Sequence, residues 1–252
     1  MVSRRSAAGA LAAAGLGGCA VLASPSRIRM DVQYDDNGCV KTQASVLLVL
    51  LPGANMALAE LQREGFVAAV RRRGLAVDVR LADANLGYAR DGSMLRHLED
   101  DVIGPARDQG YRRIWLAGIS LGGFVALGYT LHHPDQIEGL CLIAPYLGKE
   151  TLLREIEAAG GPAAWARQAA PAQPDDIERR VWQWLAAPPA GAPPLWLGYG
   201  SDDRLAEGHR LLAGILPPDR VASAPGGHDW PPWRALWSQW LDRGLLPAAC
   251  PA

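Results

Sequence analysis

Short apolar runs alternate with segments of helical spacing along most of the chain. Residues 45–51 form a continuous apolar run, which is typical of a strand buried on both faces. The next segment, 56–73, carries its apolar side chains at helical spacing and predicts a helix. By the same reading we predict further strands at 30–34, 75–82, 113–117, 137–143, 195–199 and 220–224, and further helices at 94–108, 121–133, 205–215 and 233–241. This alternation predicts an α/β fold with a mostly parallel central sheet, covered on both faces by helices.

Residues 148–193 interrupt the alternation. The segment holds Gly160-Gly161-Pro162, further prolines and Ala-rich helical pieces, of which 175–186 is the clearest. We interpret it as a small helical cap inserted above the sheet, within one domain that covers residues 24–252. In the predicted helix Ile177, Val181 and Trp184 share a face, whereas Trp182 points elsewhere.

Residues 1–23 are typical of an export segment. Arg4 and Arg5 precede an Ala/Gly/Leu-rich run that is too short to span a bilayer comfortably but suits a signal peptide. Leu16-Gly17-Gly18-Cys19 resembles the lipobox of bacterial lipoproteins, so we predict lipidation of Cys19 and anchoring of the protein at a membrane of the cell envelope. One alternative is cleavage at Val21-Leu22-Ala23, which would give a free periplasmic or secreted protein. Another is a cytoplasmic protein with an apolar N-terminal helix.

Composition narrows the class of protein and its partners. The 252 residues are 49% hydrophobic and 20% charged, with a formal net charge of -1, which indicates a soluble globular domain without the basic surface that nucleic acid requires. The chain has no P-loop, no Cys-x-x-Cys pair and no His/Cys cluster with metal-ligand spacing, so we predict neither a metal nor a cofactor. Cys141 lies in an apolar run and is predicted to be a buried free thiol. Cys39 and Cys250 lie near the two ends of the mature domain, and the sequence leaves open whether they form a disulfide.

The most informative motif is Gly118-Ile119-Ser120-Leu121-Gly122, which joins a predicted strand to an apolar helix. Small residues two positions before and after Ser120 let the backbone make a sharp strand-to-helix turn. Such a turn strains the serine backbone and lifts its hydroxyl above the sheet edge, at the positive end of the following helix. We therefore predict that Ser120 is a nucleophile.

A serine nucleophile needs a base to take its proton and a third group to orient that base. His228 follows the last predicted strand, and parallel strands carry functional groups at their carboxyl ends, so we predict it as the base. The alternative is a loop histidine without a role. The other histidines fall within predicted helices or at their ends, and we interpret them as surface or capping residues: His97, His132, His133 and His209.

Two adjacent carboxylates, Asp202 and Asp203, follow the strand predicted at 195–199. One of them can orient the histidine, while the other caps the next helix or faces water. The chain order of serine, aspartate and histidine is the order expected for a nucleophile on this kind of turn.

With these motifs the chain resembles an α/β-hydrolase over nearly all of its mature part. The matching segments are Gly118-Ile119-Ser120-Leu121-Gly122-Gly123, Gly200-Ser201-Asp202-Asp203 and Gly226-Gly227-His228. In that family the acid usually stands three residues after a glycine at the strand end, which implies Asp203. The family's early His-Gly turn reads Pro52-Gly53 here, and the resemblance implies an oxyanion hole built from the amides of Ala54 and Leu121, with Asn55 as a side-chain helper.

The resemblance implies a serine hydrolase that cleaves a small-molecule carboxylic ester or thioester through an acyl-enzyme intermediate, without a cofactor. Its catalytic residues would be Ser120, Asp203 and His228. Acyl transfer on the same residues is one alternative, and a non-catalytic envelope lipoprotein with a binding role is another. We expect the cap and the last loop to form an apolar pocket for a small or medium acyl group. The expected walls of this pocket are Leu152, Leu153, Ile156, Trp182, Leu185, Trp230 and Trp233.

Overall fold

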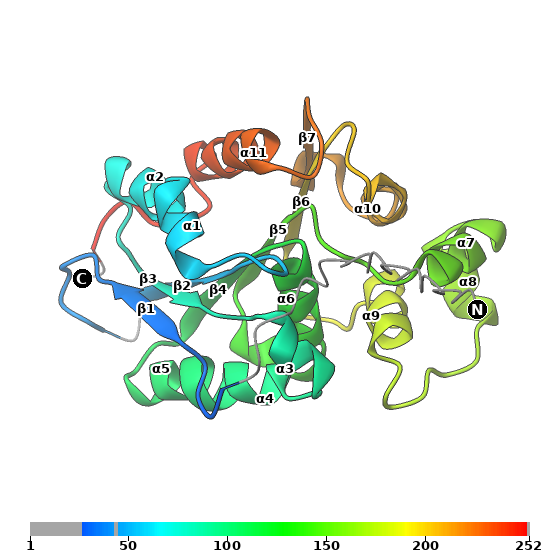
Figure 1. Ribbon diagram of the computed structural model, residues 1–252, viewed down its shortest axis with the longest axis horizontal. Helices are drawn as coiled ribbons and strands as arrows, with labels where there is room; N and C mark the ends of the chain where they lie inside the picture. Colours follow the sequence, from blue (N-terminus) through cyan, green and yellow to red (C-terminus); the bar gives the residue numbers. More distant parts are fainter. Residues whose placement is uncertain (1–26, 43–44, 251–252) are drawn as a thin grey trace, which may run out of the picture.

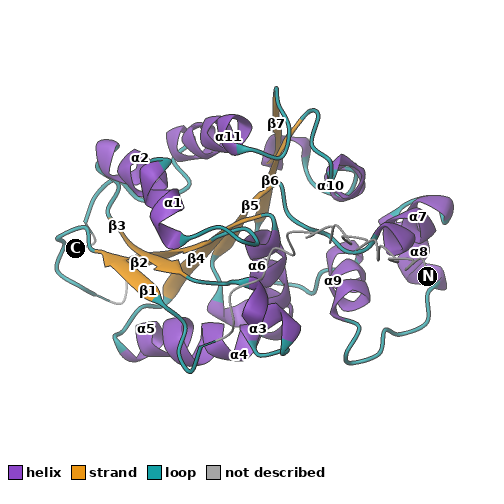
Figure 2. Ribbon diagram, viewed as in Figure 1, coloured by secondary structure: helices purple, strands orange, loops and turns teal. Residues whose placement is uncertain are grey.

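A seven-stranded sheet forms the centre of the computed structural model, which describes residues 27–42 and 45–250. The strands, orange in Figure 2, are β1 (Val32–Asp35), β2 (Val46–Leu51), β3 (Val77–Ala82), β4 (Arg113–Ile119), β5 (Gly139–Ile143), β6 (Leu195–Gly200) and β7 (Val221–Ala224). Their order is β1-β3-β2-β4-β5-β6-β7. Strand β1 is antiparallel to β3, and all the other neighbouring strands pair in parallel. The predicted mostly parallel sheet is confirmed.

Helices cover both faces of this sheet, as the sequence predicts. Figure 1 shows α1, α2 and α11 on one face and α3 to α6 on the other. The first face is rich in aromatic rings, since Phe66 stacks on Trp237 with ring centroids 5.7 Å apart. The helices that flank the sheet are α1 (Leu58–Arg63), α2 (Phe66–Arg72), α3 (Leu86–Arg90), α4 (Met94–Leu98), α5 (Gly104–Asp108), α6 (Leu121–His132), α10 (Ala206–Ala213) and α11 (Trp230–Asp242).

Two predicted long helices are broken in the structure. The segment 56–73 forms α1 and α2, because Gly65 adopts a φ of 81° between them. This left-handed conformation suits glycine and ends the first helix. The segment 94–108 contains α4, the π-helical turn Glu99–Ile103 and α5. Helix α3 has no counterpart among the predicted elements, and its five residues are too few to give a periodic signal.

Three helices lie between β5 and β6, and they form the predicted small helical cap. They are α7 (Glu150–Ala158), α8 (Pro162–Gln168) and α9 (Ile177–Ala186). The predicted orientation of α9 is wrong in one respect: Trp182 is fully buried and donates from Nε1 to the carbonyl of Leu147 at 2.7 Å, whereas Trp184 is only half-buried. Helix α9 packs against both α6 and α8, so its buried face is wider than a single stripe.

Of the cysteines in the described residues, two form a disulfide and one is free. Cys39 and Cys250 are joined by a disulfide with their Cα atoms 5.7 Å apart, which links the two ends of the described domain. Cys141 is a buried free thiol, as predicted, and burial raises the pKa of that thiol. The predicted export segment and Cys19 lie outside the described residues. Among residues 27–42 and 45–250, no helix is both long and apolar enough to cross a membrane.

Candidate active site

Ser120 stands on a sharp turn between a strand and a helix, and the glycines on either side of it make this turn possible. It directly follows β4 and precedes the first residue of α6, with φ 52° and ψ -115°. A Cβ atom at Gly118 would lie 2.3 Å from the carbonyl oxygen of Gly122, and one at Gly122 would lie 2.2 Å from that of Leu51. Neither glycine can therefore carry a side chain, which explains the motif in steric terms.

The turn is held by hydrogen bonds from the neighbouring strand end. The amide of Ser120 donates to the carbonyl of Ile143 at 3.0 Å, and the amide of Tyr146 donates to the carbonyl of Ser120 at 2.9 Å. Among the described residues the non-glycine positions with positive φ are Asn55, Ser120 and Ala144, which follow β2, β4 and β5. Backbone strain is thus concentrated at the carboxyl ends of β2, β4 and β5. Such strain persists only where the surrounding structure holds the backbone in place.

A continuous chain of hydrogen bonds joins the three residues predicted as catalytic. His228 Nε2 lies 3.0 Å from Ser120 Oγ, and its Nδ1 lies 2.9 and 3.0 Å from the two carboxylate oxygens of Asp203. The loops that carry His228 and Asp203 touch through their backbones, because a Cβ atom at Gly200 would lie 2.3 Å from the carbonyl oxygen of Gly226. The structure therefore brings together side chains from three separate strand ends.

The two neighbouring carboxylates have different surroundings. The Asp203 side chain is fully buried, whereas Asp202 is exposed and accepts a hydrogen bond from the hydroxyl of Ser201 at 3.0 Å. Burial acts to raise the pKa of Asp203, but hydrogen bonds from His228 and from the amide of Leu205 outweigh it and hold that pKa below its usual range. Asp203 is therefore a buried carboxylate that remains ionised beside the imidazole.

The predicted oxyanion-hole residues belong to two segments close to Ser120. The turn Gly53–Met56 is closed by a hydrogen bond of 3.2 Å, and a Cβ atom at Gly53 would lie 3.4 Å from Ser120 Cβ. Ala54 is half-buried in this turn. Leu121 is the first residue of α6, where the amides have no partner within the helix and the helix dipole is positive. Leu121 thus directly follows the serine, the turn that holds Ala54 lies beside it, and Asn55 is exposed.

A second histidine, His209, lies close to the site. His209 is fully buried, so its interpretation as a surface or capping residue is wrong; the same holds for buried His97, which contacts Asp101 at 2.8 Å. His209 Nε2 donates to the carbonyl of Pro145 at 2.9 Å, and its Nδ1 has no partner among the described residues. Burial lowers the pKa of His209 to about 4, although Asp203 acts in the opposite direction. His209 joins the helix after the acid to the loop that supports Ser120.

Most of the residues predicted to wall an acyl pocket are buried. Trp233 is buried and packs edge-on against the imidazole of His228, with centroids 5.0 Å apart. The cap residues of that prediction are buried in the core that the cap shares with α6: Leu152, Leu153, Ile156, Trp182 and Leu185. These side chains pack in that core, although Leu152 and Leu185 also reach the lining of surface cavities.

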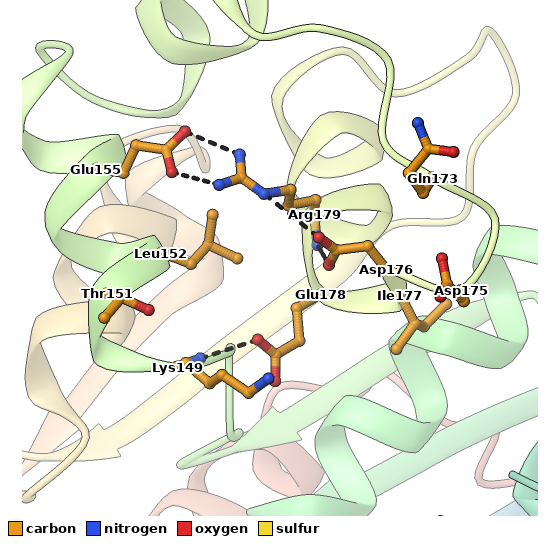
Figure 3. A pocket seen from close by; sticks show the side chains of 10 residues that line it. All are labelled: Lys149, Thr151, Leu152, Glu155, Gln173, Asp175, Asp176, Ile177, Glu178 and Arg179. Atoms are coloured by element: carbon orange, nitrogen blue, oxygen red, sulfur yellow. Dashed lines mark hydrogen bonds and ion pairs between the residues drawn. The ribbon is translucent and has the colours of Figure 1, made fainter.

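A polar cavity of about 600 Å³ lies between α7 and α9 (Figure 3). Three of its charged side chains pair with one another, since Arg179 bonds to Glu155 and lies 3.3 Å from Asp176. The backbone amide of Lys149 donates to Glu178 at 3.1 Å. Within the part of the chain that the structure describes, no group of three or more His, Cys, Asp or Glu side chains is arranged to hold a metal.

Known proteins with a similar sequence or structure share this architecture. A family model described as "Alpha/beta hydrolase family" matches residues 48–250. Est1E from Butyrivibrio proteoclasticus is similar in structure, with a TM-score of 0.58 and 15% identity over 85% of this chain and 92% of that chain. FphF, a fluorophosphonate-binding serine hydrolase of Staphylococcus aureus, gives a TM-score of 0.57 and 14% identity over 88% of this chain and 94% of that one. A thermophilic esterase from Thermogutta terrifontis gives a TM-score of 0.53 and 17% identity over 86% of this chain and 93% of that chain.

One curated relative matches a short stretch. The 1-acylglycerol-3-phosphate O-acyltransferase ICT1 of Saccharomyces cerevisiae is 44% identical over 50 residues, which are 20% of this chain and 12% of that protein. The structural neighbours, at 17% identity or less, share the fold.

Proposed function

Because this chain belongs to the alpha/beta hydrolase family, we propose that it is a serine hydrolase that cleaves a carboxylic ester or thioester. The observation that carries the proposal is the hydrogen-bonded chain from Ser120 Oγ through His228 to Asp203, with each link between 2.9 and 3.0 Å. A nucleophile, a base and an orienting carboxylate in this geometry serve acyl transfer chemistry on unrelated folds.

In the acylation step Ser120 Oγ attacks the substrate carbonyl carbon while His228 Nε2 accepts the hydroxyl proton. The carbonyl oxygen becomes negative, and the amides of Ala54 and Leu121 donate to it. Each such donor is worth about 3 kcal/mol in the transition state. The C–O or C–S bond to the leaving group then breaks, and His228 returns the proton to that leaving group.

Deacylation repeats the sequence with water. His228 accepts a proton from water, the hydroxide attacks the acyl-enzyme carbonyl, and Ser120 leaves with the proton that His228 releases. Asp203 stays ionised throughout, since its pKa lies below the usual range, and it stabilises the imidazolium that forms in each step. The products are a carboxylic acid and an alcohol or thiol.

Acyl transfer on the same residues is a second candidate function. The short match to the yeast acyltransferase favours it, because an alcohol that replaces water in the second step gives a new ester. A non-catalytic binding role is disfavoured, since Ser120, Asp203 and His228 would have no reason to keep mutual hydrogen bonds in a scaffold.

A turnover screen of the purified protein against esters and thioesters tests the proposal, with Ser120→Ala as the control. We expect hydrolysis by the wild type alone and covalent labelling of Ser120 by a fluorophosphonate probe. Labelling that persists in Ser120→Ala would refute the assignment. Added glycerol or long-chain alcohol distinguishes the two candidate functions, because an acyltransferase diverts product from acid to new ester.

We also propose that the protein is exported and that Cys19 carries a lipid. The motif at residues 16–19 motivates this, and the Cys39–Cys250 disulfide fits an oxidising compartment. Lipoproteins carry several acyl groups, and more than one is needed for stable anchoring. Mass spectrometry of the mature N-terminus in the producing cells decides between a lipidated Cys19 and an unmodified start at Ser24.

A further inference from the structure

An apolar cavity of about 590 Å³ follows helix α6 away from Ser120. Its floor includes Leu121, Phe124, Gly128 and His132. These positions are spaced by three or four residues, so they form one stripe along the helix. The stripe begins at Leu121, the residue next to the proposed nucleophile, and the volume falls within the range of about 300–1,000 Å³ that is usual for small-molecule sites.

The cavity is walled by apolar side chains that the fold leaves partly uncovered. Leu95 from α4, Phe124 from α6 and Ile177 from α9 pack against the core and are only half-buried. Phe124 and Tyr146 meet edge to face with centroids 5.5 Å apart, close to the end that adjoins Ser120. Uncovered apolar surface that faces a cavity favours an apolar ligand.

Two polar side chains of this cavity make hydrogen bonds to backbone carbonyls. His132, the last residue of α6, is exposed and bonds through Nδ1 to the carbonyl of Gly128 at 2.8 Å. Arg180 bonds to the carbonyl of Pro174 at 3.1 Å. The rest of the lining is mostly apolar, with Tyr88, Tyr146 and Asp175 as its remaining polar side chains.

We propose that this cavity binds the aliphatic acyl tail of a medium-chain ester, with the carbonyl at Ser120 and the methyl end directed toward His132. The inference rests on the proposed serine-hydrolase function and names its substrate class. The acyl tail is favoured over the alcohol, because a leaving group departs toward the residue that protonates it. That residue is His228, which precedes α11 on the opposite face of the sheet from α6 (Figure 1).

The length of the stripe sets the expected length of the tail. Gly128 lies about 10 Å along α6 from Leu121, and His132 about 16 Å, at about 1.5 Å per residue. An extended alkyl chain advances roughly 1.25 Å per carbon, given C–C bonds of about 1.5 Å. A tail of about eight carbons therefore reaches Gly128, and one of about twelve approaches His132.

Gly128 lies midway along the stripe of α6 residues that lines the cavity. A Cβ atom there would lie 3.6 Å from Leu95 Cδ2 and 3.9 Å from Ile177 Cγ1, which are ordinary contact distances. A side chain at this position can therefore be accommodated by the helix and would fill the cavity in place of a ligand. Alanine is also a better helix former than glycine, so Gly128→Ala is expected to fold.

The test is the dependence of kcat/KM on acyl length, measured with p-nitrophenyl esters from acetate to palmitate. For the wild type we expect a rise to about dodecanoate and no further gain at palmitate. Each buried methylene is worth about fourfold in kcat/KM, so Gly128→Leu should lower the dodecanoate-to-acetate ratio on the order of 100-fold. Gly128→Ala should lower the ratio about fourfold. Thr151→Leu, which enlarges a side chain of the polar cavity instead, should leave it unchanged.

The outcomes separate this inference from the function on which it rests. If folded Gly128→Leu keeps the wild-type ratio, the cavity does not hold the acyl tail and the inference is wrong, while hydrolysis of acetate upholds the serine hydrolase. A series of alkyl acetates of increasing alcohol length adds a second arm. Sensitivity to Gly128→Leu in that series alone would assign the cavity to the leaving group and overturn the inference. If no ester is hydrolysed by the wild type, the proposed function fails first.

Discussion

The sheet edge around Ser120 and the inserted helices α7 to α9 are held in place by different kinds of interaction. At the sheet edge the backbone determines position: glycines have no room for a side chain, and Ser120 is fixed by hydrogen bonds to Ile143 and Tyr146. In the insertion, side chains determine position, through the buried indole of Trp182 and the ion pair between Glu155 and Arg179.

Because of this difference, we expect the sheet edge around Ser120 to determine the catalytic rate and the inserted helices to contribute to the stability of the protein. Where the backbone fixes a site, the nucleophile contributes little to the fold and can be changed without unfolding it. Where side chains fix a helix, their loss alters packing but leaves the reacting atoms in place. Substitutions in the two regions should therefore affect different measurements, and the following experiments test that separation.

The largest effect is expected at Ser120. Ser120→Ala removes the nucleophile and should lower kcat on the order of 10⁶-fold, as in other triads. The free energy of unfolding in urea should stay close to that of the wild type, because the turn is held by backbone groups. Ser223→Ala, at an exposed serine on β7, is the matched control and should change neither quantity. A large loss of stability in Ser120→Ala would contradict the separation.

The next effect concerns the adjacent carboxylates. Asp203→Asn keeps the shape of the buried side chain but misorients the imidazole, and should lower kcat by roughly 10⁴-fold. Asp202→Asn should change kcat by less than about threefold, since exposed substitutions of this kind have small effects. Steady-state kinetics of both variants measure this contrast, and a reversed order would transfer the orienting role to Asp202.

The same contrast explains what the sequence could predict. The turn at Gly118–Gly122 is recognisable because its cause is local: glycines two residues from a serine, between a strand and a helix. The positions of Asp203 and His228 near Ser120 are also predictable, because each follows a parallel strand and the carboxyl ends of parallel strands lie at the same side of the sheet. Strands were also predictable, since β2 and β5 are buried on both faces and are continuously apolar.

What the sequence could not predict depends on contacts between distant segments. The direction of Trp182 is set by α6 and α8 together, which a single helical period does not reveal. The burial of His209 depends on the loop at Pro145, which lies 64 positions earlier in the chain. The cavity along α6 is lined by residues of α4 and α9 as well, which meet only in the folded chain, so the sequence pattern does not reveal it.

His209 lies between the two regions and should show its effect as a pH dependence of stability. Its pKa is about 4 in the folded protein, against an ordinary value near 6.5, because burial disfavours the charged form. Between these values the unfolded chain binds the proton and the folded chain does not, so stability falls as pH decreases from 6.5 to 4. The shift corresponds to about 3 kcal/mol over this interval.

Urea unfolding across that pH range measures the prediction. His209→Gln can still donate to the carbonyl of Pro145 but does not titrate, so it should lose most of the acid sensitivity. His132→Gln, at an exposed histidine, is the control and should keep it. The lowered pKa of Asp203 contributes in a different window, because its stabilisation is lost only as pH falls below the ordinary carboxyl range. An unchanged slope in His209→Gln would show that its burial has no such consequence.

The smallest effect is expected in the insertion, at Glu155. Its carboxylate accepts hydrogen bonds from Arg179 and from the indole of Trp165, which lower the pKa of Glu155 to about 2. The stabilisation is therefore present above the ordinary carboxyl pKa and is lost as pH falls through about 2. Because the side chain is 44% exposed, solvent screens the pair, and Glu155→Gln should lower the free energy of unfolding by less than about 1 kcal/mol.

Urea unfolding at low and high salt measures this loss, which should shrink at high salt because exposed ion pairs are screened. Glu150→Gln, which breaks a more exposed pair with Arg154, is the matched control and should have a smaller effect still. In both variants kcat should equal that of the wild type, since neither carboxylate touches the loops that carry the proposed catalytic residues. A fall in kcat without a fall in stability would show that the insertion positions reacting groups, and the two regions could then no longer be treated as separate.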